Sequence, residues 1–269
     1  AVGRAFSFDV LLQASRLDEE QAADALDELW QRRIVRAYGA HAYDFTHDTL
    51  REVAYADATP VRRRLLHSRI AEALEAVHAA DLDAVSAQVA AHYDLGGRHE
   101  EAVAFYRRAA HAARQVGSNR ETVQLITRAL GLLGGLPQTR TRDAHELALL
   151  TALGVALRFE KGHGADEVEQ VFERARGLAT VLGEMPEFFA VQRGLWAFHL
   201  IRAEYGTAQS LAEDLAALAD DLDDDGLRLE GGVALGLTCL WRGALAPARS
   251  HLEGAAVLFD PVRHHAHAL

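Results

Sequence analysis

A succession of helices of similar length is the feature that most constrains this fold. Between residues 83 and 258, amphipathic segments alternate with short turns marked by Gly, Asp or Pro. The second helix of a pair begins with a small residue after a tight turn, and another small or apolar residue follows seven positions later. The pairs are Ala102 and Ala109, Ala208 and Leu215, and Ala248 and Ala255. The last two sets lie 40 residues apart, which is typical of loose helical-hairpin repeats.

Helical hairpins of this kind cannot bury their apolar faces alone, so we expect them to stack into a curved array. The sequence predicts a mainly all-α fold, with a tetratricopeptide-like superhelix over 79–269 that continues beyond Leu269. The expected helices are 84–95, 100–116, 119–134, 143–160, 166–182, 187–203, 206–221, 227–242 and 245–258. The segment 134–142, GGLPQTRTR, breaks the pattern and is the best candidate for an internal loop.

Residues 1–78 follow a different pattern. Helices are predicted at 9–15 and, after an N-cap at Asp18, to about residue 33, with Ala22, Leu26, Leu29 and Trp30 on one packing face. Strands at 34–38 and 42–45 form a β-hairpin. Thr46 or Asp48 is expected to cap the next helix, and Pro60 to begin another. The segment therefore predicts a small winged-helix-like module with one β-hairpin.

Composition restricts the class of function. A net charge of -11 disfavours a nucleic-acid surface, because phosphate binding needs a basic field. The single cysteine, Cys239, lies in an apolar stretch and is expected to be a buried thiol in a reducing compartment. The sequence has neither a membrane-spanning run nor a signal peptide, which predicts a cytoplasmic protein without a membrane partner. Since the chain also lacks an initiator Met, we expect it to be part of a longer protein.

A family resemblance rests on residues spread through the first 110 positions. They are Gly3-Arg4-x-Phe6, Ala25-Leu26-x-x-Leu29-x-x-Arg32-x-Ile34-Val35, Tyr43-x-Phe45-x-His47-x-x-Leu50-Arg51-Glu52-x-x-Tyr55, Arg63-Arg64-x-Leu66-His67-x-x-Ile70-Ala71-x-Ala73-Leu74-Glu75, Ala91-His92-Tyr93 and Ala102-x-x-x-Tyr106-x-x-Ala109-Ala110. This pattern resembles the region that follows the ATPase core in large bacterial signal-transduction ATPases of the STAND type. Such proteins include multidomain adenylate or guanylate cyclases and large LuxR-type activators.

The resemblance implies a role for His47 that the residues alone do not. In related STAND ATPases a winged-helix histidine reaches the phosphates of bound nucleotide, and that role transfers to His47, with Arg51 as a weaker candidate. The alternative is that His47 only caps the helix and packs on the hairpin. No GxxxxGK(S/T) loop occurs in the chain, so the ATPase that binds ATP or ADP would precede Ala1. No cofactor is therefore expected in this chain itself.

Other candidate sites have simpler explanations. The run 221–226 matches the start of a calcium loop, but position twelve is Gly232, so a solvated turn is favoured. The tail histidines His264, His265 and His267 lack a carboxylate partner, and His163 lies in a Gly-flanked loop without a nucleophile or base nearby. Trp196, Phe198 and Trp241 are expected to pack in the core between hairpins. No arrangement indicates catalysis or a metal centre.

The sequence thus predicts a non-catalytic regulatory region whose repeats bind a partner protein or a small effector on the concave face. Its winged helix would relay that event to the upstream ATPase domain, and homo-oligomer formation is left open. The alternative is a DNA-binding winged-helix transcriptional regulator with a repeat-based sensor. Against it, the recognition helix, 18–33, is dominated by acids until its last turn.

Overall fold

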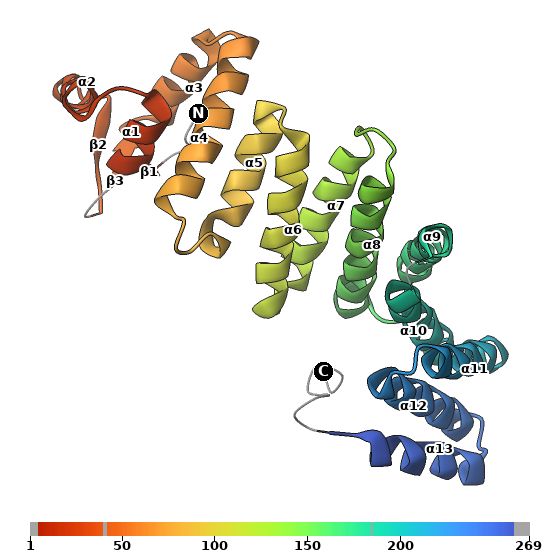
Figure 1. Cartoon of the computed structure of the whole chain (residues 1–269). Coiled ribbons are helices and arrows are strands. Elements are labelled where there is room, and N and C mark those ends of the chain that lie inside the picture. Colours follow the sequence, from red (N-terminus) through yellow and green to blue (C-terminus); the bar gives the residue numbers. More distant parts are fainter. Residues whose placement is uncertain (1–4, 40–41, 184, 261–269) are drawn as a thin grey trace. The chain divides into compact units, whose positions relative to one another are not determined.

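The computed structural model of the chain describes residues 5–39, 42–183 and 185–260 (Figure 1). It separates into two compact units, Ala1–Leu136 and Pro137–Leu269, and each is described by itself. The boundary falls inside the predicted internal loop at 134–142. The functional boundary predicted at residue 78 is a different division, between the N-terminal module and the first repeats, and stays a prediction.

The first unit begins with a small mixed module. Strand β1 (Ala5–Ser7) leads into helices α1 (Phe8–Ser15) and α2 (Glu19–Gln31), and strands β2 (Val35–Tyr38) and β3 (Ala42–Phe45) follow. The sheet is antiparallel throughout, in the order β1-β3-β2, with Phe6 opposite Tyr43 and Arg36 opposite Asp44. A predicted two-stranded hairpin is therefore a three-stranded sheet. Phe6, Leu26 and Val35 form its small core.

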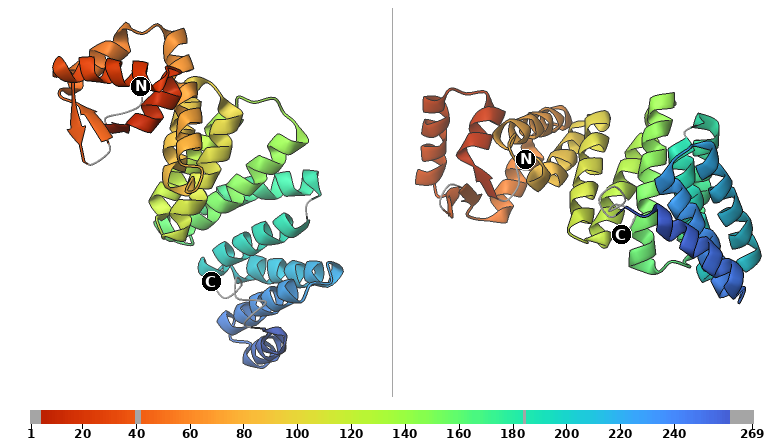
Figure 2. Two further views of the ribbon diagram at one scale, coloured as in Figure 1. Left: turned by 60° about the vertical axis from the view of Figure 1, so that its left-hand side comes forward. Right: turned by 60° about the horizontal axis from the view of Figure 1, so that its bottom comes forward.

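Helices make up the rest of the first unit. They are α3 (Asp48–Asp57), α4 (Pro60–Val77), α5 (Ser86–Gly96), α6 (His99–Gln115) and α7 (Asn119–Leu133), with a short 3-10 turn at Asp83–Val85. From α4 onward each helix packs against the next, and the views in Figure 2 agree on this order. Helix α1 also packs against α4, so the N-terminal module is attached directly to the first long helix.

The second unit contains α8 (Arg140–Lys161), α9 (Asp166–Leu182), α10 (Met185–Ile201), α11 (Tyr205–Asp221), α12 (Asp225–Trp241) and α13 (Leu245–Leu258). Consecutive helices pack together, and α10 also contacts both α8 and α12. Contacts among the alternate helices α9, α11 and α13 are sparser. Alternate helices approach each other most closely on the side toward which a stack curves. Helices α8, α10 and α12 therefore line the concave face of this unit.

The 40-residue period predicted from Ala208 and Ala248 extends back to Val168. All three are buried at the start of α9, α11 and α13, and the residues seven positions later, Ala175, Leu215 and Ala255, are buried as well. The ring of Phe172 in α9 fits between two further positions 40 residues apart, Gly154 in α8 and Gly194 in α10. A Cβ atom at either glycine would lie 2.5 Å from a ring carbon of Phe172. Small residues at these positions thus allow close packing between neighbouring hairpins.

Side-chain caps explain several helix starts. Asp18 accepts a hydrogen bond from the Gln21 N–H at 2.8 Å, as predicted, and Thr59 caps α4, which begins at Pro60. Thr139 accepts from the Arg142 N–H at 3.2 Å, so α8 begins at Arg140, three residues before its predicted start. The prediction that Thr46 or Asp48 caps α3 is wrong. His47 occupies the N-cap position, and its side chain makes no capping hydrogen bond.

Other predictions about packing need correction. Ala22 and Leu26 are buried on α2 as expected, but Leu29 and Trp30 on the same predicted face are exposed, Trp30 by 47%. Trp196 and Phe198 are buried, whereas Trp241, at the last position of α12, is 59% exposed. A stripe at helical spacing marks a packing face only as far as a neighbouring element covers it. Cys239 is buried and free, as predicted.

Candidate functional site

The candidate site is the joint at which the N-terminal module meets the first repeats. His47 is exposed at the N-cap of α3, and Arg51 lies one helical turn further on. The nearest guanidinium nitrogen of Arg51 is 3.9 Å from a carboxylate oxygen of Asp48. The Arg51 Nε is buried and has no hydrogen-bond partner among the residues described. Both side chains therefore stand at a helix N-terminus, where outward-pointing N–H groups favour anions.

Three side chains from three helices connect this region to the repeats. The Tyr55 hydroxyl on α3 lies 2.9 Å from Nε2 of His67 on α4, and Nδ1 of His67 lies 2.9 Å from Nδ1 of His92 on α5. Both histidines are buried. A continuous hydrogen-bonded chain, Tyr55–His67–His92, therefore runs from α3 to α5. Each of its members belongs to the motif residues of the family resemblance.

The protonation states of this chain follow from its geometry. Two Nδ1 atoms can share a hydrogen bond only if one carries a proton and the other offers a lone pair, so the two rings cannot both be protonated. If the Tyr55 hydroxyl donates to Nε2 of His67, then His67 donates from Nδ1 and His92 accepts. Burial lowers the pKa of His67, because a charged ring would lose its hydration. In the reverse arrangement, His92 donates to Nδ1 of His67, and Nε2 of His67 donates to the Tyr55 hydroxyl.

Further contacts of arginine and tyrosine side chains lie on either side of the Tyr55–His67–His92 hydrogen bonds. Arg63 lies over the Tyr55 ring, 5.0 Å from its centroid, and donates from Nε to the Ala58 carbonyl at 2.8 Å. On α5, Tyr93 donates a hydrogen bond to the Glu75 carboxylate. Burial and this carboxylate raise the pKa of Tyr93, so the phenol stays protonated. The joint between α4 and α5 is therefore held by polar contacts as well as by apolar packing.

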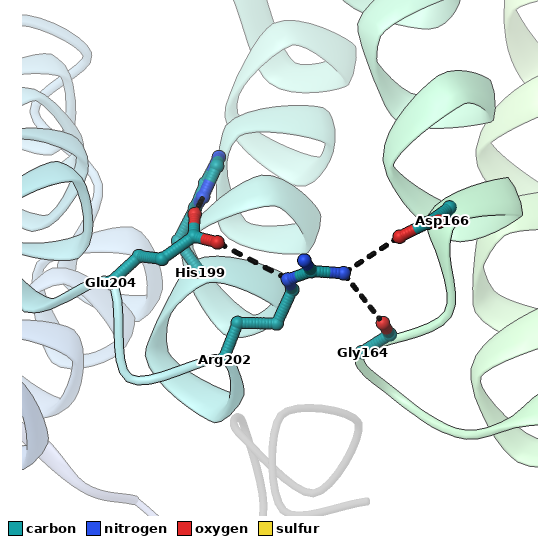
Figure 3. Close-up of polar contacts among 5 residues, drawn as sticks. All are labelled: Gly164, Asp166, His199, Arg202 and Glu204. Atoms are coloured by element: carbon teal, nitrogen blue, oxygen red, sulfur yellow. Dashed lines mark hydrogen bonds and ion pairs between the residues drawn. The ribbon is translucent and has the colours of Figure 1, made fainter.

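The second unit carries a polar cluster where two hairpin turns meet (Figure 3). Arg202, just after α10, contacts Asp166 at the start of α9 at 2.7 Å and Glu204 at 3.2 Å. Glu204 also accepts a hydrogen bond from Nδ1 of His199 at 2.6 Å. All of these charged groups except His199 are substantially exposed, so the cluster positions the turns and contributes little to stability. The sequence does not indicate this cluster, since Asp166 lies 36 residues before Arg202.

The acidic residues of the run 221–226, which resembles the start of a calcium loop, lie next to the positive side chain of Arg228. Arg228 contacts Asp220, Asp223 and Asp225 at 3.0, 2.7 and 3.1 Å. These carboxylates raise the pKa of Arg228 further above its ordinary value. Asp224 caps α12 by accepting from the Leu227 N–H at 3.0 Å. The acids of this turn thus serve to begin a helix and to bind an arginine.

The remaining histidine candidates do not assemble into a site in the described part of the chain. His163 makes an edge contact with the Phe159 ring, and burial together with the nearby Arg158 lowers its pKa. His264, His265 and His267 lie outside the described residues. Within the described ranges, the structure brings no three His, Cys, Asp or Glu side chains together as a metal site. Nor is any helix there long and apolar enough to cross a membrane.

Comparison with known proteins places the fold but not a family. The sequence matches no protein-family model. It is 28% identical over 177 residues to an uncharacterized protein of Rhizobium meliloti (strain 1021), a match that covers 65% of this chain and 17% of that protein. The chain thus spans about a sixth of the length of this curated relative.

Two solved structures share the repeat architecture. One is BtubC (BKLC) from P. vanneervenii, with a TM-score of 0.55 and 14% identity over 78% of this chain and 85% of that one. The other is a putative kinesin light chain with TPR-like repeats from Podosopora anserina, with a TM-score of 0.54 and 18% identity over 74% of this chain and 96% of that one. The predicted fold class, a mainly helical tetratricopeptide-like array after a small N-terminal module, is therefore confirmed.

Proposed function

We propose that this chain is a non-catalytic regulatory and protein-interaction region of a larger signalling ATPase. In this proposal the repeats bind a partner protein or a small effector, and the N-terminal module relays the event to an upstream nucleotide-binding domain. The observation that carries the proposal is the Tyr55–His67–His92 chain, because it joins α3, with His47 at its N-cap, to the first helices of the array. The long uncharacterized relative supports a multidomain context.

The topology of the N-terminal module supports a winged-helix-like assignment. Two helices separate β1 from the β2–β3 hairpin, and β3 pairs with both of the other strands. A winged helix also combines helices with an antiparallel sheet whose last two strands form the wing. The helix that would correspond to a recognition helix, α2, begins with Glu19 and Glu20, and its later Glu28 pairs with Arg32. Its acidic surface favours a protein neighbour over DNA.

The surface of α3 supports the idea that another domain covers it. None of the α3 residues is buried, and Leu50 and Val53 on this helix are 39% and 54% exposed. Exposed aliphatic side chains next to His47 and Arg51 suit a protein surface that also presents phosphate groups. We propose that the upstream domain occupies this surface and that His47 and Arg51 contact its nucleotide there.

The concave face of the second unit suits a protein partner. Phe159 and Ile201, near the ends of α8 and α10, are 59% and 58% exposed, and Trp241 ends α12 in the same layer. Aromatic side chains such as those of Phe159 and Trp241 are enriched at protein interfaces. In the same layer, Arg193 on α10 and Glu230 on α12 form an ion pair of 2.9 Å. A partner on this surface can affect nucleotide binding only if the N-terminal module has two arrangements relative to the upstream domain. The partner must then bind the protein more tightly in one of these arrangements than in the other.

Nucleotide titration tests the role of His47. The chain extended by its upstream region is titrated with ADP and ATP as wild type, as His47→Ala and as His111→Ala, a matched variant at an exposed histidine on α6. The proposal predicts that His47→Ala alone weakens binding by about tenfold, the loss of one charge-assisted hydrogen bond. Equal affinities of the two variants, or a parent gene without a phosphate-binding loop upstream, would contradict it.

The DNA-binding alternative is tested separately with a gel-shift series over salt. The proposal predicts only weak binding to duplex DNA at low salt. Tight binding with a steep dependence on salt concentration would favour the DNA-binding regulator instead.

A further inference from the structure

A cavity of about 520 Å³ lies where the N-terminal module meets the first long helix. It is lined from one side by α1 and the start of α2 and from the other by α4, and Figure 1 shows α1 next to α4. Its apolar lining comes from Leu12, Leu17 and Ala73. Cavities of a few hundred cubic ångströms with a few polar groups among apolar ones are the usual form of small-molecule sites.

Two arginines give this cavity unmatched positive charge. Arg16 and Arg69 both line it. Neither side chain makes an ion pair or hydrogen bond with a described residue. The Nε of Arg69 is buried without a hydrogen-bond partner in the described part of the chain. A buried donor left unsatisfied costs free energy that a bound acceptor would recover.

The acidic residues of the lining do not cancel this charge. Glu72 is already engaged by Arg98, with a nitrogen–oxygen distance of 2.7 Å. Glu19 is exposed in the first turn of α2, where the helix dipole already favours a negative group. In a chain of net charge -11, two unpaired arginines that share one cavity therefore indicate an anionic ligand rather than a general basic surface.

We propose that this cavity is a binding site for a small organic anion that bears a carboxylate or phosphate group. The anion contacts Arg69 and Arg16, and its carbon skeleton lies against Leu12, Leu17 and Ala73. The site does not depend on the function proposed above, because it requires neither nucleotide nor an upstream domain. Since α1 and α4 pack against each other beside it, a bound ligand bridges these two helices.

Calorimetric titration of the whole chain with two probes, inorganic phosphate and succinate at constant ionic strength, tests the site and distinguishes the two anion types. The variants are Arg69→Gln and Arg16→Gln, and the matched control is Arg120→Gln, which removes an exposed arginine on α7 far from the lining residues in sequence. At least one probe is expected to bind saturably. Arg69→Gln is expected to weaken that binding by about tenfold, and Arg120→Gln by less than about twofold.

Two results would overturn the site. One is that neither probe binds saturably to the wild-type chain. The other is that Arg69→Gln and Arg120→Gln lower affinity equally, since this would indicate a general effect of charge. Circular dichroism checks that Arg69→Gln folds. If it does not, Arg16→Gln at the exposed side of the cavity decides the question, because the site requires it to bind the probe more weakly than Arg120→Gln does.

Discussion

Nδ1 of His67 lies 2.9 Å from Nδ1 of His92, in the packed layer between α4 and α5. The contact requires one ring to donate a hydrogen bond from Nδ1 and the other to accept it through a lone pair. The other nitrogen of His67 is held by Tyr55 at 2.9 Å, so the two histidines extend a polar connection from α3 into the repeats. Buried polar groups of this kind are costly when one member is removed and specify a single arrangement when all are satisfied.

Removal of the Tyr55 hydroxyl isolates the first link. We expect Tyr55→Phe to lower the free energy of unfolding by about 1 kcal/mol, because Nε2 of His67 loses its partner while the ring is kept. The control is Tyr38→Phe, at a strand tyrosine that is 57% exposed, which should change stability by less than about 0.5 kcal/mol. Denaturant titrations followed by circular dichroism provide the measurement. Equal effects of the two variants would contradict a stabilising link at Tyr55.

Stability should also depend on pH through His67. Its pKa in the folded chain is below the unfolded value of about 6.5, so the unfolded state binds more protons in this range. The free energy of unfolding is therefore expected to fall as pH decreases from about 6.5 toward the lower folded pKa. The His67→Gln variant should lose this part of the slope, whereas His111→Gln, at an exposed site, should keep it. An unchanged slope in His67→Gln would show that other groups control the pH dependence.

The packing of Phe172 provides a test of the repeat geometry. Gly154→Ala places a methyl group 2.5 Å from a ring carbon of Phe172, and we expect a loss of about 1–3 kcal/mol from overpacking. Gly177→Ala on the neighbouring helix α9 meets nothing within 4 Å and should stabilise the chain by about 0.5–1 kcal/mol through helix propensity. A second substitution, Phe172→Leu, should reduce the loss in Gly154→Ala. Losses that simply add would contradict direct contact.

The environments of the tryptophans can be checked by fluorescence quenching. Trp196 is buried and donates from Nε1 to the Thr238 hydroxyl at 2.9 Å, whereas Trp30 and Trp241 are exposed. Iodide should quench two of the three emitters. Trp241→Phe should remove part of the accessible emission, and Trp196→Phe should remove only inaccessible emission. Protection of Trp241 from iodide would contradict its exposed position at the end of α12.

Helix positions were largely predictable from the sequence because their signals are local. Helix α9 was predicted with its observed bounds, 166–182, and α13 with its bounds, 245–258, since turns and small residues mark both ends. Strand β1 was missed. It has three residues, and the strand with which it pairs, β3, lies more than 30 positions away in the sequence. Three residues are too few to show the alternation of apolar and polar residues that indicates a strand, and the sequence does not show that they pair with a distant strand.

Side-chain relationships across helices were not predictable. Tyr55, His67 and His92 were noted as members of a motif, but a motif does not specify which nitrogen meets which oxygen. Trp241 belongs to an apolar stripe and yet is exposed at the last position of α12. The predicted phosphate contact of His47 stays a prediction, because its partner would belong to another domain.

The most direct test of the central claim is a double-mutant cycle across the joint. Tyr55→Phe and His92→Leu are made singly and together, in the wild-type chain and in a His67→Leu background, and the free energy of unfolding is measured for each. Since Tyr55 and His92 each bond to His67, we predict a coupling energy of at least about 0.5 kcal/mol in the wild-type chain. In the His67→Leu background this coupling should vanish. Additive effects within about 0.3 kcal/mol in the wild-type chain would contradict the account.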